Sequence, residues 1–373
     1  MVHPMANVII IGGGVVGLSL ARELAALGVH PEVYERKRDV AHGAAKASGI
    51  VSVRGLESSG MPYSGSIINR LYGADLYARG RVLRIRAAKT QAYLLDRAML
   101  AQACERAARD AGARIRKGSA LSRRAIEKLI SDPENIVVGA DGAVSTVASA
   151  ARFPPIRRYV LTYKVEYSGA HVANTGVVGL LFSKSIAPGL FGWYAPHSAS
   201  TLELGVGVEA GARFTSAAAF SSLIAGSPFG GMVAGAKRAN GFASMIPLAA
   251  RRTTVRRNVL LVGDAAGHVK ATTGGGIVFG VACAKEAARA IADHIHAGKP
   301  LARYEHMWRS KYGRELAAHG MLHSIYSNAG DAGMEAVLLT SALLGMEGFL
   351  SRYGDMDRPL LTLRRFFTMK RGS

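Results

Sequence analysis

The sequence predicts an α/β fold with an inserted antiparallel sheet and a helical tail at its C-terminus. Residues 7–11 form a short apolar, β-branched run that leads through glycines into a helical pattern. Residues 156–210 contain several short stretches typical of antiparallel strands, and residues 301–373 have the pattern of packed helices. A chain of 373 residues is long enough for one large domain or two closely joined domains.

Composition and charge restrict the class of protein. With 49% hydrophobic and 20% charged residues, the chain is not predicted to be disordered. Its 47 Lys and Arg residues against 26 Asp and Glu give a net charge of +21, which favours anionic partners. The two cysteines, Cys104 and Cys283, lie in helical, alanine-rich stretches, so neither a disulfide framework nor a metal site is predicted.

The chain shows no pattern typical of a targeting or membrane-spanning segment. The apolar run from Val8 leads into glycines instead of a cleavage site, so we expect no signal peptide. Residues 214–236 are uncharged but contain Pro228 and four glycines, which favours a helix and loop over a membrane span. We therefore expect a cytoplasmic protein, with peripheral attachment to the inner face of the cell membrane left open.

The N-terminal glycines have the spacing of a dinucleotide-binding turn. Gly12 would permit the tight turn, and Gly14 would let a pyrophosphate approach the backbone near Val15. Gly17 would let the following helix pack closely on the strand, which leaves the positive helix N-terminus facing the phosphates. A second strand over Pro31–Tyr34 ends at Glu35, the acidic residue expected to hold the ribose hydroxyls. An acidic residue there favours FAD or NAD over NADP.

Two later strands end in polar residues and glycines. The strand over Ile136–Ala140 runs into Asp141, and the strand over Asn258–Val262 runs into Gly263 and Asp264. A glycine turn at residues 272–277 then opens a helix that continues to about His296. This arrangement places a carboxylate beside the site, and a helix N-terminus that could stabilise negative charge on a reduced flavin ring.

Together these segments resemble a flavoprotein group that includes aromatic-ring hydroxylases and geranylgeranyl reductases. The order and spacing match over nearly the whole chain. The segments that carry the resemblance are Gly12–Gly17, Glu35, Tyr93–Arg97, Gly139–Gly142 and Gly263–Asp264. Within the group, residues 263–269 followed by 273–277 are most similar to the FAD-dependent, digeranylgeranylglycerophospholipid reductase-like branch. The resemblance implies a Rossmann-like FAD-binding domain, an inserted antiparallel-sheet substrate domain and a helical C-terminal region.

A second marker is the segment Pro188–Pro196, which resembles the reductase motif that lines the isoprenoid cavity. Phe191 stands where that motif usually has tyrosine, and Ala195 stands where it has phenylalanine. The resemblance implies that Phe191 and Trp193 bind the substrate, and the two exchanges remove a hydroxyl and add room. The alternative is that both are alternating core residues of an antiparallel strand.

The resemblance also implies which residues bind FAD. In the loop after the second strand, Ala47 replaces the cysteine of many relatives, and Gly49 would approach the flavin ring. No catalytic residue is identified, although His268 is a candidate acid because it lies near the glycine turn. The implied cofactor-binding residues are Gly12, Gly14, Val15, Gly17, Glu35, Ala47, Gly49, Arg97, Leu121, Asp264, Gly276 and Ile277.

The implied domains are discontinuous in sequence. Residues 1–55, 90–150 and 251–300 would form the FAD-binding domain, and residues 56–89 and 151–250 the substrate domain. Residues 301–373 read as helices, with an apolar stretch at Val337–Leu344 and a basic end. Helical packing is the simple explanation of that stretch, and a membrane or partner contact is the alternative.

The resemblance implies reduction of carbon–carbon double bonds in geranylgeranyl chains, carried by archaeal-type membrane glycerophospholipids, through hydride transfer from reduced flavin. Because the chain has one dinucleotide fingerprint, electrons must come from an external donor, either ferredoxin or NAD(P)H. The alternative is a flavin monooxygenase or dehydrogenase acting on a small or aromatic substrate. An inactive lipid-binding relative and a nucleic-acid-binding flavoprotein are further alternatives, but no nucleic-acid-binding motif is present, and we predict no such partner.

Overall fold

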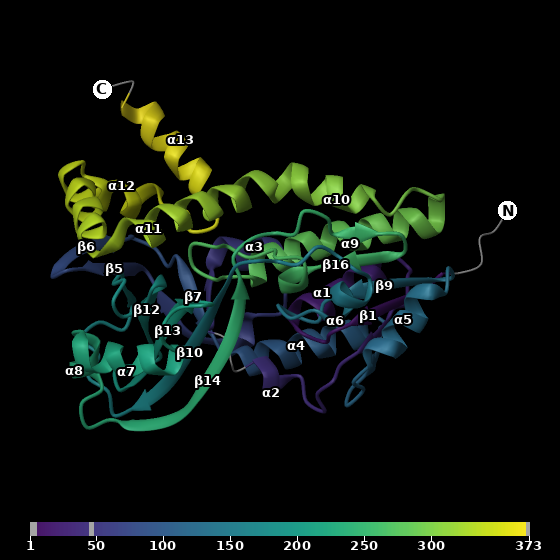
Figure 1. The fold of residues 1–373 in the computed structure, drawn as a ribbon, viewed down its shortest axis with the longest axis horizontal. Coiled ribbons are helices and arrows are strands. Elements are labelled where there is room, and N and C mark those ends of the chain that lie inside the picture. The colour runs from purple at the N-terminus through teal and green to yellow at the C-terminus, as the bar shows by residue number, and fades with distance from the viewer. Residues whose placement is uncertain (1–5, 45–47, 371–373) are drawn as a thin grey trace.

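The computed structural model describes residues 6–44 and 48–370 and contains two large sheets beneath a layer of C-terminal helices (Figure 1). The first sheet has the strand order β15-β16-β9-β1-β2-β8. In this sheet β1 lies between β9 and β2 and is parallel to both, with Ile10 opposite Val138 and Val33. Its strands are β1 (Asn7–Ile11), β2 (Glu32–Tyr34), β8 (Arg114–Arg116), β9 (Asn135–Gly139), β15 (Val255–Arg256) and β16 (Val259–Leu261).

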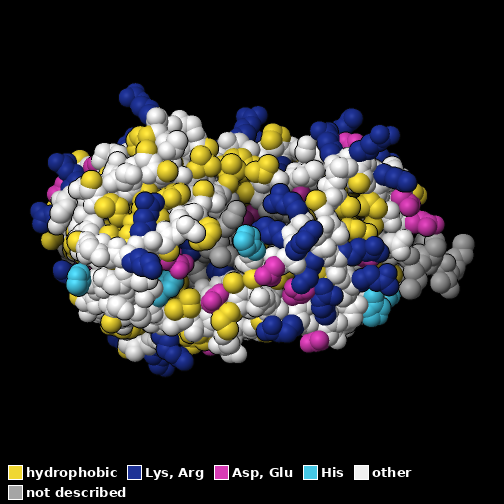
Figure 2. Space-filling model, turned by 90° about the horizontal axis from the view of Figure 1, so that it is seen from below, with side chains coloured by type: hydrophobic (Ala, Val, Ile, Leu, Met, Phe, Trp, Pro, Cys, Tyr) yellow, Lys and Arg dark blue, Asp and Glu magenta, His cyan; other side chains and the backbone are white. Residues whose placement is uncertain are grey.

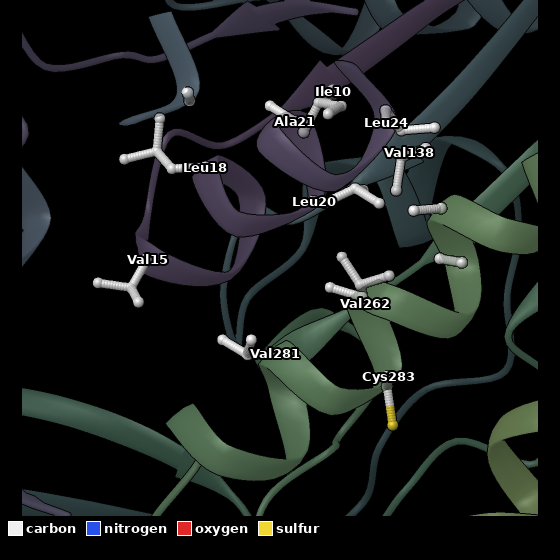
Figure 3. Packing of buried hydrophobic residues seen from close by; sticks show 14 of the residues in the cluster. Ile10, Val15, Leu18, Leu20, Ala21, Leu24, Val138, Val262, Val281 and Cys283 are labelled. Carbon is white, nitrogen blue, oxygen red and sulfur yellow. The ribbon is translucent and has the colours of Figure 1, made fainter. Parts of the chain in front are cut away.

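Helices cover both faces of this sheet, as parallel sheets require. Alternate residues of β1 enter different cores: Ile10 packs on one face, and Ile9 and Ile11 on the other. Figure 3 shows Leu20, Val262 and Val281 meeting in the first of these cores, between α1 and α9. The helices and the short 3-10 turn around this sheet are α1 (Val15–Ala26), α4 (Arg97–Asp110), α5 (Arg123–Ser131), α6 (Thr146–Ala150), η2 (Gly263–Ala265) and α9 (Ile277–Ala297).

The second sheet has seven strands in the order β14-β10-β13-β12-β11-β5-β6. Neighbouring strands are antiparallel except β11 and β5, which are parallel. The helices α7 (Ser216–Gly226) and α8 (Phe229–Met232) pack on one face through Phe220, Leu223 and Phe229. The strands are β5 (Gly73–Ala78), β6 (Arg81–Arg86), β10 (Tyr159–Ser168), β11 (Val177–Leu181), β12 (Gly189–Pro196), β13 (Thr201–Glu209) and β14 (Lys237–Pro247).

A small antiparallel sheet, β3-β7-β4, holds segments that the predicted domain boundaries assign to different domains. Its strands are β3 (Ile50–Ser52), β4 (Ile67–Leu71) and β7 (Ala92–Leu95). The short helices nearby in sequence are α2 (Ala41–Ala44), α3 (Val53–Ser59) and η1 (Ser64–Ser66). The strands of the two large sheets fall within the ranges predicted for the FAD-binding and substrate domains, but those boundaries stay a prediction.

The C-terminal helices run across both parts of the molecule (Figure 1). They are α10 (Arg303–Trp308), the π-helical turn η3 (Arg309–Gly313), α11 (Arg314–Leu343), α12 (Met346–Tyr353) and α13 (Pro359–Lys370). Tyr304 and Trp308 are fully buried against the first sheet's core, whereas Met334 and Leu338 pack beside Leu83 of β6. The expectation of an α/β fold with an inserted, mostly antiparallel sheet and a helical tail is thus confirmed.

The apolar stretch Val337–Leu344 is only partly accounted for by helix packing, because Leu338 is 4% exposed but Leu343 is 78% exposed. Within the described ranges, no single helix has both the length and the apolar character needed to cross a membrane. The segments Arg303–Leu343 and Met346–Tyr353, bent by 79° relative to each other, meet those two criteria only when taken together.

His268 is a core residue and not part of a cavity wall. Its ring is fully buried, lies 4.6 Å from the Trp308 ring, and has no hydrogen-bond partner among the described residues. Burial lowers the pKa of His268 to about 3, and burial together with Lys270 lowers the pKa of His319 to about 4. Both imidazoles are therefore neutral near pH 7, so the suggestion that His268 is a proton donor is not supported by its position.

The low pKa values of His268 and His319 predict that the folded protein loses stability in acid. Their folded-state pKa values lie below that of a free imidazole, so the unfolded chain binds more protons between about pH 6.5 and 4. The free energy of unfolding should therefore fall as the pH falls through this window, by at most about 1.4 kcal/mol per pH unit for each histidine. Urea unfolding at pH 7.5 and pH 5 would measure the loss.

The variant His268→Leu should keep most of its stability at pH 7.5, because it removes two unsatisfied ring nitrogens. It should lose less stability than the wild type between pH 7.5 and pH 5. Equal losses in the two proteins would contradict the assignment of acid sensitivity to His268.

Candidate functional site

The glycine turn between β1 and α1 depends on two glycines and leaves open space at a third. Gly12 has a φ of +111°, and a Cβ there would lie 2.2 Å from the carbonyl oxygen of Ala140. A Cβ on Gly17 would lie 2.1 Å from the carbonyl oxygen of Gly12. A Cβ on Gly14 would meet nothing within 4 Å, so this position faces open space at the start of α1, where Val15 is the first helical residue. That space at a helix N-terminus fits a pyrophosphate.

Glu35 lies at the end of β2, directly beside the glycine turn. One carboxylate oxygen accepts a hydrogen bond from Gly13 N at 2.7 Å, and the other accepts one from Lys37 N at 2.8 Å. Each oxygen keeps a further lone pair, so the carboxylate can still accept from ribose hydroxyls. The backbone carbonyl of Glu35 binds Ser119 N at 2.9 Å, which places Leu121 two residues further along the same loop. Glu35 and the loop that contains Leu121 therefore lie together beside the glycine turn.

Arg97 and Asp264 lie close enough for each charge to shift the pKa of the other. Arg97 begins α4, and its buried Nε has no hydrogen-bond partner among the described residues. Burial raises the pKa of Asp264, although the guanidinium of Arg97 opposes this shift. Burial also lowers the pKa of Arg97, with Asp264 acting in the opposite direction. An unsatisfied buried donor beside a half-buried carboxylate is typical of a site for a polar ligand.

Arg97 also lines a small cavity of about 60 Å³ at the glycine turn that opens α9. Gly276 is the N-cap of α9, and a Cβ there would lie 2.7 Å from Asp264 Oδ1. The walls are formed by Ser48, Ile50, Val51, Arg97, Lys270, Gly274, Gly275, Gly276, Ile277 and Val278. Backbone amide groups at a helix N-terminus, a cationic side chain and missing Cβ atoms fit the polar edge of a flavin.

Two further residues predicted to contact the flavin are Ala47 and Gly49. Ala47 lies outside the described residues. A Cβ on Gly49 would lie 2.0 Å from the carbonyl oxygen of Leu95, and the carbonyl of Gly49 accepts from Leu95 N at 2.9 Å. Close pairing with β7 thus requires a glycine at this position, and its contact with a flavin ring stays a prediction.

A larger apolar cavity of about 170 Å³ lies between the second sheet and the glycine turn. Phe191 and Trp193, from β12, both line it, and both also belong to a buried hydrophobic cluster. The two explanations of these aromatic residues, cavity lining and core packing, therefore hold together. The walls are Ser48, Ile50, Thr162, Lys164, Val178, Leu180, Leu190, Phe191, Trp193, Ser244, Ile246, Lys270, Thr273, Gly274, Gly275 and Met356.

The two cavities share part of their walls, namely Ser48, Ile50, Lys270, Gly274 and Gly275. Two lysines that the sequence pattern did not predict line the cavities: Lys164 lines the apolar cavity, and Lys270 lines both. Lys164 Nζ lies 2.6 Å from Glu203, which also accepts from Trp193 Nε1 at 2.8 Å. Lys270 Nζ lies 2.6 Å from Asp357. The only sequence signal for Lys270 was a lone cation next to the glycine turn, and no spacing connects it with Asp357.

Gly14 provides a test of cofactor binding that separates it from folding. The variant Gly14→Ala has an ordinary backbone conformation and open space for its Cβ, so the thermal unfolding midpoint of the FAD-free protein should change little. The added methyl group would occupy the space predicted for the pyrophosphate, so the FAD dissociation constant should rise at least tenfold. Fluorescence titration with FAD measures this change.

The matched variant Gly12→Ala should instead fail to fold stably, because of its positive φ and the contact with Ala140. If Gly14→Ala bound FAD as tightly as the wild type, the pyrophosphate would not lie at this turn.

The chain is similar to several known proteins. A family model described as FAD dependent oxidoreductase matches residues 7–91, which contain the glycine turn and Glu35. The chain is 27% identical to digeranylgeranylglycerophospholipid reductase 2 of Methanothermobacter thermautotrophicus, over 89% of this chain and 90% of that protein. It is 24% identical to digeranylgeranylglycerophospholipid reductase of Methanothrix thermoacetophila, over 87% of this chain and 88% of that protein.

Solved structures show the same fold. A geranylgeranyl bacteriochlorophyll reductase-like protein from Thermoplasma acidophilum has a TM-score of 0.78 at 16% identity, covering 96% of this chain and 95% of its own. The flavin-dependent brominase Bmp2 has a TM-score of 0.71 at 15% identity, covering 99% of this chain and all of its own. The resemblance drawn from the motifs is thus confirmed, and the chain is an FAD-dependent oxidoreductase related to the geranylgeranyl reductases.

Proposed function

We propose that this enzyme reduces isolated carbon–carbon double bonds in the geranylgeranyl chains of an archaeal-type glycerophospholipid. The observation that carries the proposal is the shared wall between the apolar cavity and the smaller cavity at the glycine turn. A chain segment in the first cavity would lie directly beside a flavin in the second. The relatives named as digeranylgeranylglycerophospholipid reductases support the same substrate class.

The cavity suits an apolar chain better than a polar substrate. Phe191, Trp193, Ile246 and Met356 supply apolar walls, and the two lysines are each neutralised by a carboxylate. An unactivated double bond has no carbonyl group to polarise, so the protein must hold it in a dry, shaped space. At about 170 Å³ the cavity is smaller than a typical ligand pocket of roughly 300–1,000 Å³, so it suits the reacting part of a chain.

The residues at the glycine turns would hold the cofactor, and bound FAD, once reduced, supplies the hydride. The electron donor would be external, as the single dinucleotide fingerprint predicts. Lys and Arg side chains are spread over the face shown in Figure 2, with fewer acidic side chains among them, and such a surface would attract an acidic ferredoxin or the phosphates of NAD(P)H.

We also propose a peripheral contact with anionic membranes through α11–α13. Several large apolar side chains are exposed there, among them Leu343 (78%) and Phe367 (61%). Arg364 and Arg365 are exposed on α13, the same helix as Phe367. Apolar side chains flanked by arginines are typical of helices that lie in a lipid interface. The site would thereby be held at the surface that contains its substrate.

The catalytic proposal is tested by anaerobic reduction. The FAD-loaded protein, reduced with dithionite and freed of excess reductant, should be reoxidised by a geranylgeranyl glycerophospholipid. The product should gain two hydrogens for each reduced bond, measured by mass spectrometry alongside the visible spectrum. Flavin that stays reduced with the lipid, but is reoxidised by oxygen with hydroxylation of an aromatic substrate, would instead establish the monooxygenase alternative.

The membrane proposal is tested by sedimentation with vesicles that contain anionic lipid. The variant Arg364→Gln/Arg365→Gln should bind at least tenfold more weakly, since each arginine near an anionic surface contributes about 1 kcal/mol. Binding of the wild type should weaken as the salt concentration rises.

The matched control is Arg123→Gln/Arg124→Gln on α5, an exposed pair distant from α13 in Figure 1. It makes the same charge change and should leave vesicle binding nearly unaltered. Equal effects of the two variants would show that net charge, and not this surface, controls the attachment.

A further inference from the structure

Lys270 is a buried cation at the junction of the two cavities. Its side chain is 4% exposed, and it lines both the apolar cavity and the cavity at the glycine turn. The turn itself holds it in place, because Lys270 N donates to the carbonyl of Gly275 at 3.1 Å, and Gly274 N donates to the carbonyl of Lys270 at 2.8 Å. A Cβ on Gly275 would lie 2.8 Å from Lys270 Cε, so the lysine side chain passes directly over this glycine.

Asp357 connects Lys270 to a different part of the molecule. It follows α12, and its carboxylate binds Lys270 Nζ at 2.6 Å and also accepts a hydrogen bond from the hydroxyl of Ser52. Burial alone would raise the pKa of Asp357, but Lys270 and Ser52 hold it below its ordinary value. The carboxylate is therefore ionised, and each of its oxygens keeps a further lone pair.

Asp357 also lines a groove of about 560 Å³ on the other side of this pair. The groove has several charged side chains in its walls, among them Arg54, Lys285, Lys311 and Glu315, whereas the larger cavity lined by Lys270 is mainly apolar. The ion pair thus stands between a groove with charged walls and a mainly apolar cavity. A lysine and an aspartate in direct contact connect the two, because Lys270 lines the cavity and Asp357 lines the groove.

Resting on the function proposed above, we propose that Lys270 is the proton donor in the reduction and that Asp357 passes it a replacement proton from the groove. One carbon of the double bond accepts hydride from the reduced cofactor. The π electron pair forms the second C–H bond with a proton from Lys270 Nζ, whose N–H bond breaks. The neutral amine then regains a proton from water in the groove through the Asp357 carboxylate.

Other buried ionisable groups are less well placed. Of the five residues that line both cavities, only Lys270 carries an ionisable side chain. Lys164 lines only the apolar cavity and is held between Glu203 and Glu166, at 2.6 and 3.6 Å. His319 is not in either described cavity wall and is engaged by Thr272 and the backbone carbonyl of Asp357.

The variant Lys270→Arg tests the proposal directly. Arginine keeps the positive charge and the partner carboxylate, but a guanidinium does not give up its proton in proteins. We expect anaerobic reoxidation of the reduced protein by geranylgeranyl lipid to slow by at least 100-fold, within the usual range for loss of a general acid. The FAD dissociation constant and the flavin reduction potential should stay close to those of the wild type.

A second variant, Lys270→Met/Asp357→Asn, removes both charges together, so that neither is left buried alone. It should show the same loss of reoxidation rate. The matched control is Glu105→Gln/Arg109→Met, which removes a carboxylate–arginine pair on α4 that lines none of the three cavities described here. Its reoxidation rate should stay within threefold of the wild type.

Two results would overturn the role of Lys270 without overturning the proposed function. In the first, Lys270→Arg reduces the lipid as fast as the wild type does. In the second, the flavin reduction potential of Lys270→Arg changes in parallel with the reoxidation rate. The second result would mean that Lys270 acts on the flavin charge and not as an acid. A wild-type protein that the lipid fails to reoxidise would instead refute the proposed function, and with it this role.

Discussion

The close approach of α1 and α9 at the carboxyl edge of the parallel sheet is the constraint on which the site depends. A Cβ on Gly280 of α9 would lie 2.7 Å from a methyl group of Val16 on α1, so the helices pack with a glycine between them. Each helix begins at a glycine turn, and both N-termini therefore lie near the same edge of the sheet. Two positive helix ends in one place suit a cofactor with a pyrophosphate at one end and a ring that gains negative charge at the other.

The second sheet and the C-terminal region supply the remaining walls of the site. β12 brings Phe191 and Trp193 to the apolar cavity, and the segment after α12 brings Met356 to the same walls. The adjacent Asp355 forms an ion pair with Arg54 at 2.8 Å, and Asp357 binds Lys270. The tail is therefore bound to the edge of the site by two carboxylates. Its helices act as a wall of the site as well as a cover for the sheet.

What the sequence could predict was local, and what it missed was long-range. Gly12, Gly17 and Glu35 lie within one strand–turn–helix–strand unit, so their spacing alone was enough to place them together. Lys270 and Asp357 are 87 positions apart, and no periodicity links a glycine turn to a loop between two C-terminal helices.

Some glycines have a structural reason that the sequence pattern does not show. The missing side chain of Gly49 makes room for the backbone of Leu95, and its predicted contact with a flavin stays a prediction. The apolar stretch on α11 was similarly ambiguous, because the sequence alone does not distinguish an apolar side chain that packs on a sheet from one that is exposed. Only the packing separates the buried Leu338 from the exposed Leu343.

The apolar cavity is lined by two lysines that each form a buried pair with a carboxylate, and the energetics of these pairs differ from those of the surrounding core. Removing two charges from water costs several kcal/mol per ion, and apolar replacements of the same size are often as stable or more stable. The pair formed by Lys164 and Glu203 also holds the indole of Trp193, so it positions a cavity wall. The pair formed by Lys270 and Asp357 holds no aromatic ring, yet it stands where the two cavities meet the groove. The pair binds the segment after α12 to the glycine turn, and it also stands where the proposed proton transfer needs it.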